Sequence, residues 1–306
     1  LIIFSHILVC LTGSIILKED HSSIIFNSQF NSSIGSMDKL EHLSVIKVSG
    51  EDADEFLQGQ MTQSTEAINN DLLHLTSFCN PQGRVLATAL IQSWNEAYYL
   101  ILSSDLIDDL ITCLNRYILR SKVYLTKEEI NIFGINVSKK NNSDQSFIQS
   151  KNQSLRSLAN DDSRLILLSY NDEEEQFQTI SKEDWIIQDI KTGLPLINKI
   201  NTIKYIPQML NLDDLNAISF TKGCYTGQEV VARVQHRGKI KQRMYQLEIE
   251  TDDFVSPQVE VRNIDKKVGS VVMSARSNNI CHALAVISID YADKNLSING
   301  CKVNLN

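Results

Sequence analysis

The clearest pattern along the chain is a series of short apolar stretches in which apolar and polar residues alternate. Alternation with a period of two is typical of β-strands that bury one face. The pattern predicts strands at 43–48, 72–79, 84–92, 97–103, 122–126, 130–138 and 164–170, and, closer to the C-terminus, at 241–250, 267–276, 280–290 and 296–305. Asn80-Pro81-Gln82-Gly83 has the composition of a turn, so the strands on either side of it are expected to form a hairpin.

Three segments show helical spacing of apolar residues instead, and they are 51–60, 105–119 and 181–192. Ser181 and Asp184 have the spacing of a capping box, and Gly193 is expected to end the last of these helices. Residues 139–163 are rich in Lys, Asn, Ser, Gln and Asp, which predicts a surface excursion with little core. Together these elements predict an α+β protein that ends in a small antiparallel β-barrel.

The periodic spacing of apolar residues that is typical of strands and helices begins only after Met37. Residues 1–17 are uncharged and largely apolar, but a spanning helix needs roughly 20 residues, and a secretory signal needs a preceding positive segment. We therefore expect residues 1–36 to be a non-native or disordered extension and the protein to be cytoplasmic, with no membrane contact. Residues 37–238 are expected to form the main region in two lobes, and 239–306 the C-terminal barrel.

Composition narrows the function classes. A hydrophobic fraction of 42% is normal for a globular protein, and a net charge of −8 argues against binding nucleic acid by bulk charge. None of the six cysteines lies in a C-x-x-C pair, so neither a zinc site nor a disulfide scaffold is expected, and no metal site is predicted. The chain contains no P-loop, dinucleotide fingerprint or hydrolase nucleophile elbow.

Most of the chemistry lies in the segment Lys222-Gly223-Cys224-Tyr225-Thr226-Gly227-Gln228-Glu229. Thr226 and Glu229 have the spacing of a capping box, so a helix is expected to begin at Gly227. Cys224 would then lie near the positive end of the helix dipole and close to Lys222, and both features favour the thiolate. From these residues alone, a reactive thiol and an ordinary buried cysteine in a helix-entry turn are about equally supported.

The surrounding segment 222–243 is basic within an acidic chain. It holds one acid, Glu229, and six cations, which are Lys222, Arg233, Arg237, Lys239, Lys241 and Arg243. Such a concentration of positive charge favours an anionic ligand such as a polyglutamate tail, a phosphate or RNA. A solvated strand-and-helix surface is the alternative.

The segment 222–229, followed by Val231-Ala232-Arg233, resembles the signature of the YgfZ family. Weaker similarities to the same family lie at Phe56–Thr62, which matches its first-helix motif, and at Ser121–Val123, Gly193–Ile197, Ile206–Gln208, Asn211-Leu212 and Ile218–Phe220. The resemblance covers the chain from about residue 37 to the C-terminus.

The resemblance implies a GcvT-like fold, that of the glycine-cleavage aminomethyltransferase, with three domains in a ring around a central folate site. It implies tetrahydrofolate as cofactor and Cys224 as the functional thiol. It further implies a role in tRNA modification and in the assembly or repair of iron–sulfur enzymes. Partners would be those enzymes and tRNA-modifying enzymes, with any contact to tRNA being indirect.

The resemblance also suggests folate-binding residues. Two family tryptophans associated with folate correspond to Trp185 and to Leu43, and Leu43 departs from the pattern because it offers a pterin less area and no polar group. Without the resemblance, Trp185 would be assigned to plain core packing, since it lies on an amphipathic helix. The remaining candidates are Lys222, Tyr225, Gln228, Glu229 as a bidentate partner of the pterin, and Arg233, Arg237 or Lys239 for the glutamate tail.

Two other functions stay open. A one-carbon transferase would need an acid or base beside the folate nitrogen, and no carboxylate can be placed there from sequence. A direct RNA-binding module could use segment 222–243, although only Tyr225 and Tyr245 are interleaved with its cations. A non-enzymatic folate-dependent factor is expected in preference to either.

Overall fold

The structure is a computed structural model that describes residues 38–68, 72–136, 148–171 and 179–305. Before these, only the backbone of three short strands is described, β1 (Ile7–Val9), β2 (Ser14–Glu19) and β3 (Ser22–Asn27), which pair antiparallel in that order. The expectation for residues 1–36 therefore falls mainly outside the described residues and stays a prediction.

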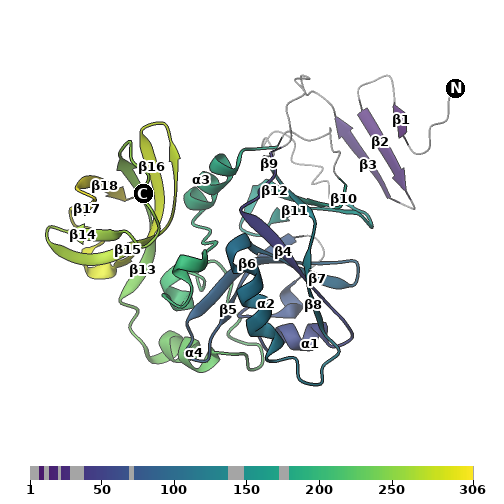
Figure 1. Cartoon of the computed structure of the whole chain (residues 1–306), viewed down its shortest axis with the longest axis horizontal. Helices are drawn as coiled ribbons and strands as arrows, with labels where there is room; N and C mark the ends of the chain where they lie inside the picture. Colours follow the sequence, from purple (N-terminus) through teal and green to yellow (C-terminus); the bar gives the residue numbers. More distant parts are fainter. Residues whose placement is uncertain are drawn as a thin grey trace.

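A mixed nine-stranded sheet forms the body of the protein (Figure 1). Its order is β8-β4-β7-β6-β5-β11-β12-β9, with β10 paired to β11. Among the described strands, the one parallel pair joins β11 to β5, and through it two antiparallel halves become one continuous sheet. The strands are β4 (Leu43–Ser49), β5 (Leu72–Cys79), β6 (Val85–Trp94), β7 (Ala97–Ser103), β8 (Tyr124–Glu128), β9 (Asn131–Asn136), β10 (Ile148–Gln149), β11 (Gln153–Leu158) and β12 (Asp161–Ser169).

Four α-helices accompany this sheet in the described part of the chain, α1 (Ala53–Gln58), α2 (Ile107–Asn115), α3 (Lys182–Thr192) and α4 (Gln228–Arg237). The predicted caps of α3 are confirmed, since Ser181 Oγ accepts from the backbone N of Asp184 at 3.1 Å and Gly193 ends the helix at φ 70°. Helix α2 ends earlier than the sequence pattern predicts. Short 3₁₀ turns complete the body, at Thr65–Ala67, Ser104–Leu106, Lys199–Asn201 and Pro207–Leu210, with a fifth at Ile289–Tyr291 in the barrel.

The C-terminal strands close into the predicted antiparallel barrel, in the order β13-β16-β15-β14-β17-β18. They are β13 (Gln242–Glu250), β14 (Glu260–Asn263), β15 (Lys266–Ser277), β16 (Ile280–Ser288), β17 (Leu296–Ile298) and β18 (Cys301–Leu305). The barrel has a core of its own, which includes the buried residues Ile249, Val261, Val271 and Ile287. It packs through β15 and β16 against α3, beside the main sheet (Figure 1).

The expected surface excursion at 139–163 is partly wrong, because β11 lies inside the main sheet with most of its residues buried. Its polar composition misled the prediction. Ser154 is fully buried and donates to Gln92 Oε1 at 3.1 Å, and the guanidinium of buried Arg156 donates to the carbonyl of Leu155. Buried polar groups are tolerated where partners satisfy them, and only the tertiary structure supplies those partners.

Candidate functional site: an exposed cysteine on a clamped turn

The signature segment forms a tight turn that leads into helix α4. The helix begins as expected, but its N-cap is Gly227, at φ 86°, with no side-chain capping bond. The predicted capping box is therefore wrong: Thr226 instead donates from Oγ1 to Gln60 Oε1 at 3.1 Å. A β-carbon on Gly227 would lie 2.6 Å from the carbonyl oxygen of Asn80, so the close approach and the positive φ together require glycine.

This turn is fastened to the first-helix motif, more than 150 residues earlier in the chain. The backbone N of Thr226 donates to the carbonyl of Gly59 at 3.1 Å. Lys222 Nζ donates to two further carbonyls, those of Met61 at 2.9 Å and Gln63 at 2.7 Å. The signature segment and the first-helix motif thus form one unit, held together by hydrogen bonds between them.

The Lys222 side chain serves this clamp. It is partly buried, and its Nζ lies 5.2 Å from the centre of the Tyr225 ring, within range of a cation–π contact. Burial lowers the pKa of Lys222 to about 8 and raises that of the buried Tyr225 phenol. Lys222 is expected from the sequence to favour the Cys224 thiolate through its charge; the structure shows that its ammonium also has a structural role, since it donates to two backbone carbonyls.

Cys224 stands out from the other described cysteines because it is exposed. It lies three residues before the N-cap of α4, at the outer side of the clamped turn. Cys79 lies beneath the same turn, since a β-carbon on Gly227 would be 3.0 Å from Cys79 Cβ, and burial raises the pKa of its thiol to about 12. The fold therefore offers one thiol of this pair to solvent and keeps the other protonated and enclosed.

The remaining predicted residues of α4 face solvent to different degrees. Gln228 Nε2 donates to the carbonyl of Gly223 at 3.4 Å, which closes the turn, while Glu229 and Arg233 are exposed. Glu229 is not used for capping and is free to face a ligand. Arg243, one of the six cations counted in segment 222–243, is paired with Asp213 in a bidentate ion pair at 2.6 and 2.8 Å, so its charge is already compensated.

Trp185 and Leu43, the two expected folate contacts, lie in the core and away from solvent, at 0% and 4% exposure. The Trp185 ring fills the space above Gly134, where an added β-carbon would lie 2.3 Å from Cε3. Over the ring, Arg164 Cζ stands 4.7 Å from its centre. Among the hydrogen bonds of the described residues, none joins the side chain of Trp185 or Leu43 to residues 222–229.

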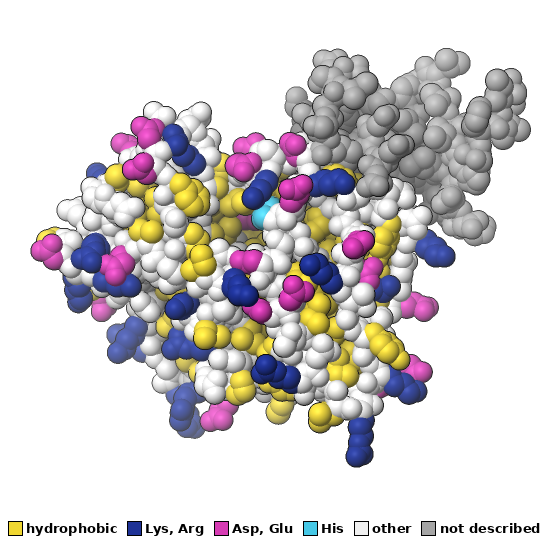
Figure 2. All heavy atoms as spheres, viewed as in Figure 1, with side chains coloured by type: hydrophobic (Ala, Val, Ile, Leu, Met, Phe, Trp, Pro, Cys, Tyr) yellow, Lys and Arg dark blue, Asp and Glu magenta, His cyan; other side chains and the backbone are white. Residues whose placement is uncertain are grey.

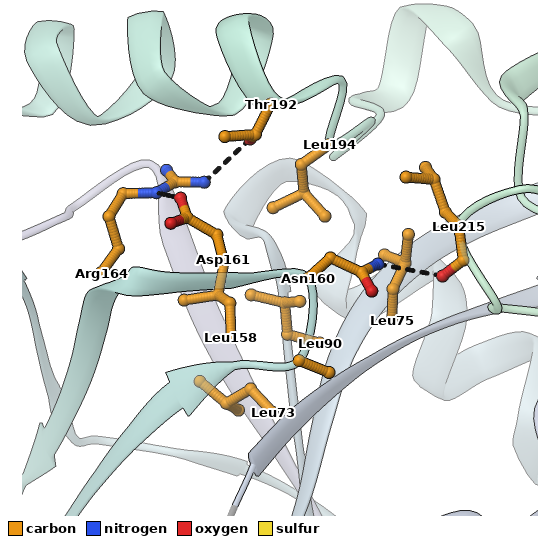
Figure 3. Close-up of a pocket in the computed structure, with 11 residues that line it drawn as sticks. Leu73, Leu75, Leu90, Leu158, Asn160, Asp161, Arg164, Thr192, Leu194 and Leu215 are labelled. Atoms are coloured by element: carbon orange, nitrogen blue, oxygen red, sulfur yellow. Dashed lines mark hydrogen bonds and ion pairs between the residues drawn. The ribbon is translucent and has the colours of Figure 1, made fainter. Parts of the chain in front are cut away.

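Arg164 is the centre of a buried charge cluster beside Trp185. It donates to Asp189 at 2.6 Å, to Asp161 at 2.6 Å and to Thr192 Oγ1 at 3.0 Å. Burial raises the pKa of Asp189 to about 6, although Arg164 opposes the shift. Figure 3 shows Arg164 and Asp161 pointing at each other below Thr192, at the edge of a leucine-lined pocket. The pocket measures about 10 Å³, which is about the space that one water molecule occupies.

These surroundings do not fit a folate ring in this conformation. One observation favours a ligand, since the buried Trp185 Nε1 has no hydrogen-bond partner among the described residues. Gly134 and Arg164 nevertheless occupy the space around the indole, and the pocket beside Arg164 is far smaller than the roughly 300 Å³ of an ordinary ligand site. We therefore derive no chemical step through folate.

The described residues lack two further features, a metal-binding cluster and a membrane-spanning helix. They contain no group of three or more His, Cys, Asp or Glu side chains arranged to hold a metal ion. Nor do they contain a helix with the length and apolar character that crossing a membrane requires.

Comparison with solved structures identifies the class of fold. The aminomethyltransferase of the glycine cleavage system from Bartonella henselae superposes with a TM-score of 0.66, covering 89% of this chain and 86% of that one at 12% identity. The protein thus has an aminomethyltransferase-like, GcvT-like α+β fold that carries a clamped signature turn with an exposed cysteine. The expected fold class, including its C-terminal barrel, is confirmed.

Sequence comparison identifies the family. A Hamiltonella defensa protein named tRNA-modifying protein YgfZ is 32% identical over 229 residues, covering 68% of each chain. A Yersinia pseudotuberculosis protein of the same name is 28% identical over 228 residues. An uncharacterized Haemophilus influenzae protein is 33% identical over 214 residues, covering 69% of this chain and 73% of its own. No protein-family model matches the chain. The chain belongs to the YgfZ family.

Sequence reasoning missed the residues that support the signature turn. Gln60 and Gln63 lie in or beside the first-helix motif, and the hairpin turn at 80–83 packs against Gly227. A β-carbon on Gly83 would lie 2.7 Å from Val230 Cβ, so this glycine is also part of the support. The only sequence signals were the glycines and glutamines themselves, and nothing in their spacing pairs them with residues 222–229.

Proposed function

We propose that this protein acts in tRNA modification as an accessory factor whose working group is the Cys224 thiol. The observation that carries the proposal is the exposure of Cys224 on a turn clamped by the two family motifs. A surface thiol needs no such support for stability, whereas a thiol that must meet a partner in a fixed orientation does. The names of the relatives supply the process.

Iron–sulfur enzymes, including those that thiolate tRNA, are the proposed partners. A single thiol cannot fill the four-ligand set of an iron–sulfur cluster. Because no metal-binding cluster occurs among the described residues, further ligands would have to come from a partner or from a small thiol. Cys224 would be the thiol that contacts the partner. The cytoplasm is the proposed compartment, because the five described cysteines of the protein are free thiols.

Tetrahydrofolate is the proposed cofactor, supported by the likeness of the fold to an aminomethyltransferase. Binding against Trp185 would require the cluster around Arg164 to open, since the ring is enclosed in this conformation. The unpartnered Trp185 Nε1 would gain a hydrogen-bond partner in such an open form. Glu229 and the exposed cation Arg233 remain the candidates at the surface.

The central test measures thiolated nucleosides in tRNA from a strain that lacks its own family member. The wild-type chain should restore thiolation, and Cys224→Ser should not. Cys301→Ser is the matched control, since it changes another free thiol that lies outside the signature turn. Full restoration by Cys224→Ser, at equal protein level, would refute the proposed role of the thiol.

A separate test addresses folate. Trp94 and Trp185 are the only tryptophans, so Trp185→Phe assigns any fluorescence change on titration with tetrahydrofolate. We expect saturable binding that is weakened by this substitution and detected independently by calorimetry. Absence of binding at millimolar ligand would remove folate from the proposal and leave a thiol-dependent factor.

A further inference from the structure

A second feature of the molecule lies apart from the signature cysteine: an open groove of about 540 Å³ between the body and the barrel. The body contributes Arg84, at the end of the β5–β6 turn, and Lys204. The barrel contributes Lys266 and Lys267 from β15. Figure 2 shows Lys and Arg side chains gathered on the lower left of this face, beneath the barrel.

All the charged side chains that line the groove, among the described residues, are positive. None of the described residues that line it is Asp or Glu. Lys204 is exposed and makes no ion pair in the described part of the chain, and Arg84 only donates to the carbonyl of Lys204 at 2.9 Å. Lys266 donates to the Tyr291 hydroxyl at 2.6 Å, whereas Lys267 has an acidic neighbour, Glu260, at 3.2 Å. Three of the four cations therefore make no ion pair with a described acidic residue, in a chain of net charge −8.

A neutral hydrogen-bond network holds the two walls in register. Gln258 Nε2 donates to the Tyr205 hydroxyl at 2.7 Å, and that hydroxyl lies 3.0 Å from Ser270 Oγ. Tyr205 belongs to the body, while Gln258 and Ser270 belong to the barrel. These bonds fix the spacing of the two walls that carry the cations.

Further exposed cations lie on the segment that leads to the groove. Arg237, Lys239 and Lys241 are exposed and lie along the connection from α4 to β13, whose first residue, Gln242, lines the groove. The backbone N of Ile289 donates to the carbonyl of Lys241 at 3.0 Å, which fixes this connection beside the groove residue Ser288. A single phosphate would be neutralised by one or two of these cations, whereas a row of them matches a chain of phosphates.

We infer that the groove binds the phosphate backbone of an RNA, and that the row of cations leading from α4 extends the contact. This inference rests on the proposed role in tRNA modification for the choice of RNA over other polyanions. It replaces the expected indirect relation to tRNA with a direct one. It also connects the RNA to the signature turn, because Arg84 directly follows Gly83, which packs against α4.

The test measures binding of an unmodified tRNA transcript to the full chain by fluorescence anisotropy, over a range of salt concentrations. Lys204→Gln/Lys266→Gln removes one cation from each wall. Lys127→Gln/Lys302→Gln is the matched control, since both lysines are exposed, neither lines the groove, and the net charge changes equally. The groove variant should bind at least about tenfold more weakly at 0.1 M salt, with a salt slope shallower by about 2, whereas the control should stay near wild type.

Several outcomes would overturn the inference. One is equal weakening by the two double variants, which would indicate bulk charge alone. Another is saturable binding of AMP, but not of tRNA, lost in the groove variant, which would assign the groove to a small phosphate ester. Competition by a polyglutamate peptide as strong as that by RNA would assign it to an acidic protein. Thermal melting of both variants controls for folding.

The test separates this inference from the proposed function. Cys224→Ser should bind tRNA as the wild type does, because Cys224 does not line the groove. Normal thiolation with Cys224→Ser would defeat the proposed function while leaving tRNA binding in the groove intact. Loss of thiolation with Cys224→Ser, together with no tRNA binding by the wild type at low salt, would defeat only the groove.

Discussion

The signature turn and the Trp185 cluster are two regions that the same family resemblance marks as functional, and they are built in opposite ways. The turn holds Cys224 in solvent through hydrogen bonds to the backbone of another segment. The cluster encloses Trp185 completely between Gly134 and the buried guanidinium of Arg164.

This difference separates two reasons why a residue can matter. Loss of an enclosed charge pair costs folding free energy, because its partner is left buried and unpaired. Loss of an exposed thiol costs almost no folding free energy, so its importance must lie in what it contacts. Substitutions in the two regions should therefore affect stability and function in opposite proportions.

The largest expected effect is on stability, in the Trp185 cluster. Arg164→Met leaves Asp189 buried without its cation and should lower the free energy of unfolding by about 3–5 kcal/mol. Arg164→Met/Asp189→Leu removes the two fully buried charges, leaves only the partly exposed Asp161 without its cation, and should recover much of that loss. Urea denaturation measures both. A loss below about 1 kcal/mol for the single variant would show that the cluster is more open to water than its geometry indicates.

The next effect tests the clamp on the signature turn. Gly227→Ala should lower the free energy of unfolding by about 3 kcal/mol, because the residue has a positive φ and its β-carbon would lie 2.6 Å from the Asn80 carbonyl oxygen. Gly223→Ala, four residues earlier, has open space around its β-carbon and should stay within about 0.5 kcal/mol of wild type. Equal stability of the two variants would mean that the turn is not clamped as described.

A smaller effect on stability is expected at His42, and it depends on pH. Burial lowers the pKa of His42 to about 4 from 6.5, and neither ring nitrogen has a hydrogen-bond partner among the described residues. Between pH 4 and pH 6.5, His42 therefore binds a proton more strongly in the unfolded state than in the folded state. His42 therefore contributes stability above about pH 6.5 that is lost as the pH falls toward 4, by about 2 kcal/mol at pH 5.

The comparison of His42→Gln with wild type isolates this contribution, since the variant should lose less stability between pH 7.5 and pH 5. The comparison is needed because Asp189 acts in the other direction: its raised pKa favours the folded state at low pH, and that benefit is lost as the pH rises through about 6. Parallel pH curves for the two proteins would contradict the expectation.

The smallest effect on stability is expected at Cys224. Cys224→Ser should change the free energy of unfolding by less than about 0.5 kcal/mol, because the side chain is exposed. The same substitution should remove one fast-reacting thiol from the native protein in a titration with a thiol reagent. Buried Cys79 and Cys281 should react only after denaturation. An unchanged number of fast thiols would show that Cys224 is shielded.

Much of the fold could be predicted from local pattern. The hairpin β5–β6, the caps of α3 and most barrel strands follow from alternation, capping residues and turns, which act over a few neighbouring residues. Strand β11 could not be predicted, because its polar residues become buried only through partners elsewhere in the sheet. The four-residue strand β14 is too short to show a period.

The sequence by itself determined the family and the start of helix α4 at Gly227, and it pointed to Cys224 as the candidate thiol. Only the tertiary structure decided that Thr226 bonds Gln60 rather than capping α4, that Lys222 reaches two distant carbonyls, and that Trp185 is enclosed. It also brought Arg84 and Lys204 opposite Lys266 and Lys267. These results depend on contacts between residues far apart in the chain, and the spacing of residues within a single segment carries no information about them.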